Sequence, residues 1–290
     1  MYSAISANKR NTVFIMAVFL LIIGGLGALA AYAYRSWVVA VIVVAVAAIY
    51  AVIQFFAASR EALAINGARE IQKKDAPELY RIVENLAITE GLPTPKVYIM
   101  NDPSPNAFAT GRNPKTASVA VTTGLMEIMD KREVNAVLAH EMGHVKNYDI
   151  LVSMVAFGLV GAIGMLADIL ARMFIYGNNR NNNKNSGPLM IVGLVGLILA
   201  PIAATLVQLA VSRQREYLAD ASGALTTRDP EALASALEKL KTHGQPMQKQ
   251  NKSTASMFFS NPLKKASGLF QTHPPLDERI KRLRGNATKM

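Results

Sequence analysis

Two histidines and a glutamate stand close together near the middle of the chain, in the run from His140 to His144 that reads HEMGH. On a helix, residues four positions apart share one face, so both imidazoles could bind a single zinc ion. Glu141 could then act as a general base, because zinc lowers the pKa of a bound water towards about 7. The alternative is a polar helix face with two solvated histidines. The helical periodicity of residues 133–145 favours the zinc site.

A catalytic zinc ion needs a third protein ligand and an open position for water. The other two histidines, His243 and His273, do not form a second pair, and the chain has no cysteine. A carboxylate is therefore the better candidate. Glu216 and Asp220 stand four residues apart on a predicted helix, where Glu216 can complete a His/His/Glu set and Asp220 can accept a hydrogen bond from a ligand histidine. The alternative is a surface face whose acids pair with neighbouring arginines.

Long apolar segments separate these polar groups. Hydrophobic residues make up 51% of the 290 residues, and they are concentrated in blocks, which favours a membrane protein. The blocks are residues 13–34, 37–58, 151–171 and 187–211. Each of the first two can cross about 30 Å of hydrocarbon, and together they predict a helical hairpin. The first is too long, and lacks a convincing cleavage site, for a signal peptide.

The distribution of positive charge predicts the orientation of this hairpin. The flanking basic residues are Lys9 and Arg10 before it and Arg60, Arg69, Lys73 and Lys74 after it, with only Arg35 in its turn. The positive-inside rule places both ends in the cytoplasm. Since His140 and Glu216 must meet at one ion, the chain between them crosses the membrane twice or not at all. We attribute the net charge of +11 to such flanking residues rather than to nucleic-acid binding, for which no motif is present.

The remaining segments are polar enough for a water-soluble domain in two parts. Predicted elements are a helix that starts at residues 75–78 and stops at Gly91, strands at 97–100 and 119–122, a loop or irregular edge at 101–114, a helix from Asp229 to Leu240, a loose stretch at 245–256 and a basic helical tail from Thr272. Asp149 is interpreted as a polar group at the membrane edge with no chemistry. Asp168 lies inside an apolar block, where such residues are often functional.

These features predict an α+β, predominantly α fold: a zincin-like metalloprotease domain with a small β-sheet, attached to transmembrane helices. The predicted divisions are an N-terminal transmembrane hairpin (1–59), a first catalytic part with the HExxH helix (60–150), two further apolar helices with a polar loop (151–211) and a second catalytic part with the third zinc ligand (212–290).

Several motifs in a fixed order make the sequence resemble the HtpX proteases of bacterial membranes, relatives of the CAAX prenyl proteases. They are the hairpin, the helix from Pro77, the segment 106–111 (NAFATG), HEMGH, the two later apolar blocks, the segment 216–220 and His273-Pro274-Pro275 with Arg279. The resemblance covers nearly the whole chain.

The resemblance implies a role for each matching residue. His140, His144 and Glu216 are the implied ligands of one zinc ion per subunit, Glu141 is the catalytic base and Asp220 orients a ligand. Two further groups are implied: His273 and Arg279 as candidates for stabilising the oxyanion or holding the site together, and Asn106, Ala107, Phe108 and Ala109 as the edge that pairs with the substrate backbone. An ordinary turn, a proline-rich loop and a surface arginine are the alternatives.

The predicted function is zinc-dependent hydrolysis of peptide bonds by an endopeptidase. The resemblance implies quality control of misfolded or damaged membrane proteins, in the bacterial cytoplasmic (inner) membrane, by a multi-pass protein whose catalytic domain faces the cytoplasm. One alternative is a CAAX-type processing protease, a family with more spans than the four seen here. Another is a catalytically silent zinc-binding membrane scaffold, whose metal would be closed by four protein ligands.

Overall fold

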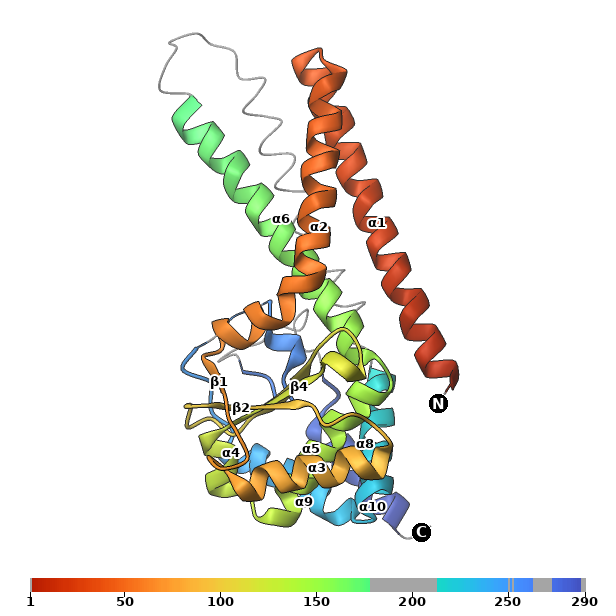
Figure 1. Ribbon diagram of the computed structural model, residues 1–290, viewed down its shortest axis with the longest axis vertical. Coiled ribbons are helices and arrows are strands. Elements are labelled where there is room, and N and C mark those ends of the chain that lie inside the picture. The colour runs from red at the N-terminus through yellow and green to blue at the C-terminus, as the bar shows by residue number, and fades with distance from the viewer. Residues whose placement is uncertain (1, 178–212, 250, 252, 263–272, 288–290) are drawn as a thin grey trace.

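The computed structural model describes residues 2–177, 213–249, 251, 253–262 and 273–287. Three long helices rise from one end of a globular part (Figure 1). The helices are α1 (Tyr2–Tyr34), α2 (Trp37–Ile65), α3 (Pro77–Glu90), α4 (Thr123–Ile128), α5 (Lys131–Lys146), α6 (Asp149–Gly177), α8 (Arg213–Thr227), α9 (Pro230–His243) and α10 (Leu276–Ala287), with short 3-10 helices η1 (Pro114–Thr116) and η3 (Ala255–Met257). The strands are β1 (Ala68–Glu70), β2 (Lys96–Met100), β3 (Ala107–Thr110) and β4 (Ser118–Thr122). This architecture confirms the predicted fold class.

The long helices α1 and α2 form a hairpin, with only Arg35 and Ser36 between them. Their outer faces carry exposed large apolar side chains, such as Leu21 (76% exposed) and Trp37 (74%), which suits lipid rather than water. By length and composition, the stretches Ile5–Gly25 and Ala40–Ile65 could each cross a membrane. Among the described residues, α5 and residues Asp149–Ile163 of α6 are apolar enough to make a third span only if the two helices, bent by 77° relative to each other, are taken together.

Of the two later apolar blocks, only the first lies within the described residues. The block at 151–171 lies within α6, which packs against both helices of the hairpin; their shared core includes Ile15, Phe19 and Leu159. The block at 187–211 and the side chain of Asp168 lie outside the described residues. The predicted four-part division of the chain stays a prediction.

A four-stranded sheet, in the order β1-β2-β4-β3, forms one layer of the globular part. β2 and β4 are parallel, whereas β1 and β3 are antiparallel to their neighbours. Of the two alternatives predicted for residues 101–114, a loop or an irregular edge, residues 107–110 take the second and form the edge strand β3. All four are buried, so they lack the alternation of apolar and polar residues that marks a strand covered on one face only.

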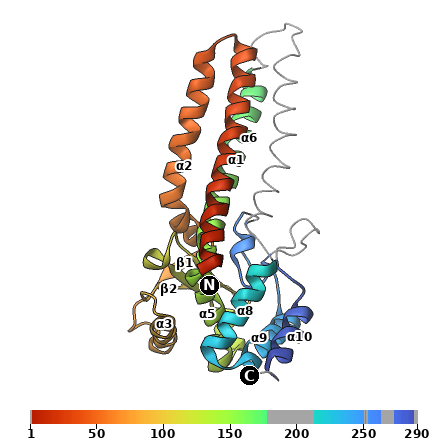
Figure 2. The same ribbon diagram turned by 90° about the vertical axis from the view of Figure 1, so that its right-hand side faces the viewer.

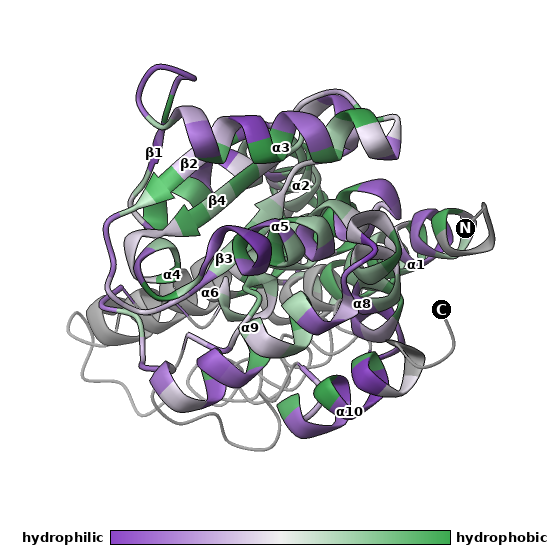
Figure 3. Cartoon of the chain, turned by 90° about the horizontal axis from the view of Figure 1, so that it is seen from below, coloured by the Kyte–Doolittle hydropathy of each residue, from purple (hydrophilic) through white to green (hydrophobic). Residues whose placement is uncertain are grey.

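Helix α5 lies at the centre of the globular part and contacts α3, α8, α9 and β3. The strands are largely hydrophobic, whereas α3 alternates between hydrophobic and hydrophilic residues (Figure 3). A capping box starts the helix: Asp130 accepts from the Glu133 backbone while the Glu133 side chain accepts from the Asp130 backbone. The Glu133 carboxylate also accepts hydrogen bonds from Ser235 and Lys239 of α9. The helix that carries HEMGH is therefore fixed at its start by local and tertiary contacts.

Candidate metal centre

Close packing of α8 against α5 brings the HEMGH helix next to the 216–220 segment. A β-carbon added to Gly223 would stand 2.9 Å from the backbone nitrogen of His140, and one added to Gly143 would stand 3.4 Å from the Cα of Ala219. The absence of side chains at both glycines lets the two backbones approach. Glu216 and Asp220 consequently face the histidines although more than 70 residues separate them in sequence.

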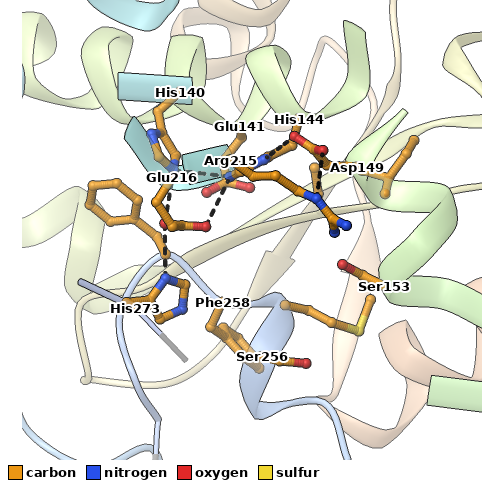
Figure 4. A pocket seen from close by; sticks show the side chains of 14 residues that line it. His140, Glu141, His144, Asp149, Ser153, Arg215, Glu216, Ser256, Phe258 and His273 are labelled. Atoms are coloured by element: carbon orange, nitrogen blue, oxygen red, sulfur yellow. Dashed lines mark hydrogen bonds and ion pairs between the residues drawn. The ribbon is translucent and has the colours of Figure 1, made fainter. Parts of the chain in front are cut away.

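The three predicted ligands, His140, His144 and Glu216, converge at one point (Figure 4). The Nε2 atoms of His140 and His144 are 3.1 Å apart, and oxygens of Glu216 lie 3.8 and 3.6 Å from them respectively. Ligands bound about 2.0–2.1 Å from one tetrahedral zinc ion are about 3.4 Å apart, and the measured separations lie around that value. Within the described residues, this group has the geometry to hold a metal ion.

Carboxylates behind the two imidazoles direct their Nε2 atoms towards this point. His140 Nδ1 lies 2.9 Å from Asp220 Oδ1, and His144 Nδ1 lies 2.9 Å from Asp149 Oδ2. A proton on each Nδ1 leaves the Nε2 lone pairs facing one another beside the Glu216 carboxylate. Such a group of electron-pair donors favours a cation at its centre, so the residues present fit a metal ion.

The protonation of the two histidines in the absence of metal supports this interpretation. Burial lowers the pKa of His140 to about 4. Burial also lowers the pKa of His144, but the hydrogen bond with Asp149 and the charge of Glu216 outweigh it and raise the pKa to about 9. His144 then carries a second proton, which it can donate to His140. A metal ion at this point would displace that proton, as is usual when a histidine becomes a ligand.

Asp149 is a residue whose role the sequence interpretation missed. It was interpreted as a polar group at the membrane edge without chemistry, and this is wrong because its side chain is buried and hydrogen-bonded to His144. Helix α5 ends at Lys146, and the bend at Asn147 and Tyr148 turns the first residue of α6 back towards the second histidine. The only signal in the sequence was the position of Asp149, five residues after His144 and so one residue beyond the i+4 spacing of a helical neighbour.

Glu141 lies in the same pocket, which is lined by residues of α5, α6, α8, β3 and the segment 256–259. Its carboxyl group is buried, and Ala109 of β3 lines the pocket beside it. Burial, opposed by His144 and helped by Glu216, raises the pKa of Glu141 to about 7. A carboxyl group with that pKa can both accept and release a proton near neutral pH.

His273 and Arg279 both reach the site, from different directions. His273 Nδ1 is 2.9 Å from Glu216 Oε2, and the ring lines the pocket. Its Nε2 is buried without a hydrogen-bond partner among the described residues. Arg279 is fully buried and donates two hydrogen bonds to Asp220, at 2.9 and 2.7 Å. Arg279 thus supports the carboxylate behind His140 rather than lining the pocket.

The predicted substrate edge, residues 106–109, is partly occupied by the chain itself. Phe108 forms an isolated antiparallel bridge with Phe258, and the Phe259 N–H donates to the Ala107 carbonyl at 2.8 Å. The Asn106 side chain both donates to and accepts from the Ser260 backbone. The predicted looseness of residues 245–256 is wrong for their last part, since η3 lies there and leads into this bridge. Of these four residues, only Ala109 lines the pocket.

Comparison with known proteins places this fold and site in a family. The family described as Peptidase family M48 matches residues 73–287, and the chain belongs to it. It is a membrane metalloprotease whose group of His140, His144 and Glu216 is suited to a metal ion. The predicted resemblance is thereby confirmed.

Relatives named "Protease HtpX homolog" match over almost the whole chain. One from Tropheryma whipplei (strain Twist) is 53% identical over 98% of both chains. One from Streptococcus gordonii is 43% identical over 98% of this chain and 99% of its own length. Among solved structures, the crystal structure of S. mikatae Ste24p aligns with a TM-score of 0.52 at 20% identity, over 98% of this chain and 67% of that one. This last match concerns the fold alone.

Proposed function

We propose that the protein is a zinc-dependent endopeptidase, with one zinc ion per subunit, that hydrolyses peptide bonds of misfolded or damaged membrane proteins. The observation that carries the proposal is the convergence of His140, His144 and Glu216 beside the buried Glu141 in one pocket. A bound zinc ion would supply Lewis-acid activation of water and of the peptide carbonyl. Glu141 would take the proton of the attacking water and pass it to the leaving amine.

The other residues of the pocket suit the handling of a peptide. Ala109, next to the part of β3 that is already paired, offers backbone groups to an extended substrate. His273 Nε2, which has no hydrogen-bond partner among the described residues, is available to a bound peptide and suits the predicted role at the oxyanion. Asp220 and Asp149 would hold the ligand rings, and Arg279 would hold Asp220.

The placement in the membrane supports the choice of substrate. We infer a multi-pass protein of the bacterial cytoplasmic membrane whose pocket faces the cytoplasm, because basic residues flank both ends of the hairpin. The metal group lies at the start of α6, because Asp149, the first residue of that helix, contacts the ligand His144. An unfolded segment emerging from a membrane protein would meet the pocket within a short distance of the bilayer.

A catalytically silent zinc scaffold is the main competing role, and the ligand set favours an enzyme. Structural zinc is usually closed by four protein ligands, whereas the metal group found in the described residues has three. Cleavage of an unfolded membrane protein by the zinc-loaded, detergent-purified chain should fall at least about 1,000-fold in Glu141→Gln, with the zinc content unchanged. Equal cleavage by the two proteins would reject Glu141 as the base.

A second experiment tests the metal and its third ligand. Glu216→Gln should lose stoichiometric zinc, measured by elemental analysis after gel filtration, whereas Glu84→Gln, an acid of α3 that pairs with Lys73, should retain it. Chelation should abolish cleavage by the wild-type protein, and added zinc should restore it. Full zinc content in Glu216→Gln would mean that another group is the third ligand. Cleavage confined to prenylated C-terminal peptides would favour the narrow processing role instead.

A further inference from the structure

The bend between α5 and α6 is a strained connection next to the metal group. It consists of Asn147, Tyr148 and Asp149, and the helices on either side are bent by 77°. Tyr148 has a φ of 63°, in the left-handed region that bulky residues rarely adopt. A backbone in that conformation persists only where surrounding contacts hold it. The contacts that hold this bend therefore also fix the position of Asp149, whose carboxylate orients His144.

The first turns of the membrane helix α1 supply those contacts. Asn8 Nδ2 donates to the Asn147 carbonyl at 2.8 Å and to Asp149 Oδ1 at 2.6 Å. The amino group of Lys9 lies 4.8 Å from the centroid of the Tyr148 ring. Two consecutive residues of α1 thus contact all three residues of the bend. Because Asn8, Asn147 and Asp149 are each buried, water does not compete for these hydrogen bonds.

We propose that Asn8 is a positioning residue of the metal centre, acting on His144 through Asp149. One oxygen of Asp149 accepts from Asn8, and the other contacts His144 Nδ1 at 2.9 Å. Arg215 also lies 3.7 Å from the oxygen that Asn8 contacts. Because one oxygen of Asp149 is held by Asn8 and the other contacts His144, the carboxylate fixes the orientation of the His144 ring. Nε2 of that ring then stays directed towards the metal point. The inference rests on the proposed function, since it takes His144 to be a metal ligand.

The packing of α1 further along its length makes this contact depend on the membrane anchor. Ile15, Phe19 and Ile23 of α1 are buried in the cluster that they share with α6. The N-terminal end of α1 comes down beside the globular part, at the level of the bend (Figures 1 and 2). Seated on α6 in this way, α1 carries Asn8 to its two acceptors. The anchor then serves as a structural part of the site as well as a tether.

A matched pair of variants in the full-length, zinc-loaded protein tests the proposal. Asn8→Ala removes the donor, and Asn11→Ala changes the same residue type less than one turn away, where the side chain is only partly buried. We expect Asn8→Ala to weaken zinc binding about 3- to 10-fold in competition with a chelator, somewhat less than removal of a direct histidine partner. Asn11→Ala should stay within about 2-fold of wild type.

Two further measurements separate positioning from a general loss of stability. With cobalt in place of zinc, the visible absorption spectrum reports ligand geometry, so Asn8→Ala should shift it and Asn11→Ala should not. Asn8→Asp keeps the size of the side chain but sets a carboxylate against Asp149, so its zinc affinity should fall further than that of Asn8→Ala. A purely structural role would lower the melting temperature of the metal-free protein and leave the affinity and spectrum of the folded fraction unchanged.

The outcomes distinguish this inference from the proposed function. If wild type and Asn11→Ala bind zinc tightly while Asn8→Ala and Asn8→Asp match them in affinity and cobalt spectrum, Asn8 has no positioning role. If wild type itself binds no zinc, the proposed function fails first. If it binds zinc and Asn8→Ala weakens binding, but Glu141→Gln still cleaves, the positioning role stands and the assignment of the base falls.

Discussion

The two ligand histidines lie one turn apart on the same helix, yet the carboxylates behind them are held by different elements. Behind His140, the Asp220 carboxylate is held by Arg279, so this support comes from α8 and α10 of the globular part. Behind His144, the Asp149 carboxylate of α6 is held by Asn8 of α1, and Arg215 of α8 lies 3.7 Å from the same oxygen, so most of this support comes from α6 and α1. The metal group therefore depends on two sets of contacts, and variants at Arg279 and at Asn8 weaken one set each.

Breaking the support on the globular side should have the largest effect. Arg279→Met leaves Asp220 buried without its cationic partner, and removal of one member of a buried pair typically costs about 3–5 kcal/mol. The melting temperature in mild detergent should fall accordingly, and zinc binding should weaken with it. Arg282→Met, on the same helix but exposed, should cost at most about 1 kcal/mol. Similar melting temperatures for the two variants would contradict the assigned role of Arg279.

The membrane side should respond differently, with a loss of metal affinity that exceeds the loss of stability. Asp149→Asn keeps the volume but removes the charge behind His144, so zinc affinity should fall about 10- to 100-fold. Asp220→Asn should show a similar fall in affinity and, in addition, a lower melting temperature, because the buried Arg279 loses its hydrogen-bonded carboxylate and keeps only Glu216, 3.7 Å away. Chelator competition and thermal unfolding on both variants measure the difference. Equal melting temperatures would remove the distinction between the two sides.

The close contact of α5 with α8 offers a way to disturb the metal group from a residue that is not itself a ligand. Gly223→Ala would set a β-carbon 2.9 Å from the backbone of His140, and overpacking of this kind typically costs about 1–3 kcal/mol. Since α8 carries Glu216, zinc affinity should fall as well. Gly285→Ala has open space around its β-carbon and a helical setting, so it should not destabilise the protein. An unaffected zinc affinity in Gly223→Ala would show that the helices can separate without moving Glu216.

The sequence allowed these elements to be predicted where the signal is local. The HEMGH helix and the strands β2 and β4 have clear periodicity or a short apolar run, and the spacing of His140 and His144 needs only helical geometry. Glu216 could be chosen because zinc chemistry required a third ligand and the chain offered no further histidine pair. The resemblance of several sequence motifs to a known protease family then supplied the remaining site residues.

What could not be predicted depends on long-range contacts or on unusual backbone conformation. Asp149 reaches His144 only because Tyr148 adopts a left-handed conformation, and no periodicity signals that turn. β3 is buried on every side, so its four residues show no alternation. Asn8 meets Asp149 across 141 residues of sequence, and an asparagine before an apolar span ordinarily indicates nothing more than a membrane interface.

Removal of the Lys9 charge should have the smallest effect of these variants on zinc affinity, and it tests which contact of α1 matters for His144. Lys9 contacts the Tyr148 ring through its charge, and such contacts are worth about 0.5–1 kcal/mol at partly exposed sites. Lys9→Met keeps the length of the side chain and removes the charge, so zinc affinity should change less than about 3-fold and less than in Asn8→Ala. Chelator competition on the two variants in parallel decides the order. A larger loss in Lys9→Met would mean that the strained Tyr148 backbone, rather than the hydrogen bond to Asp149, transmits the influence of α1 to His144.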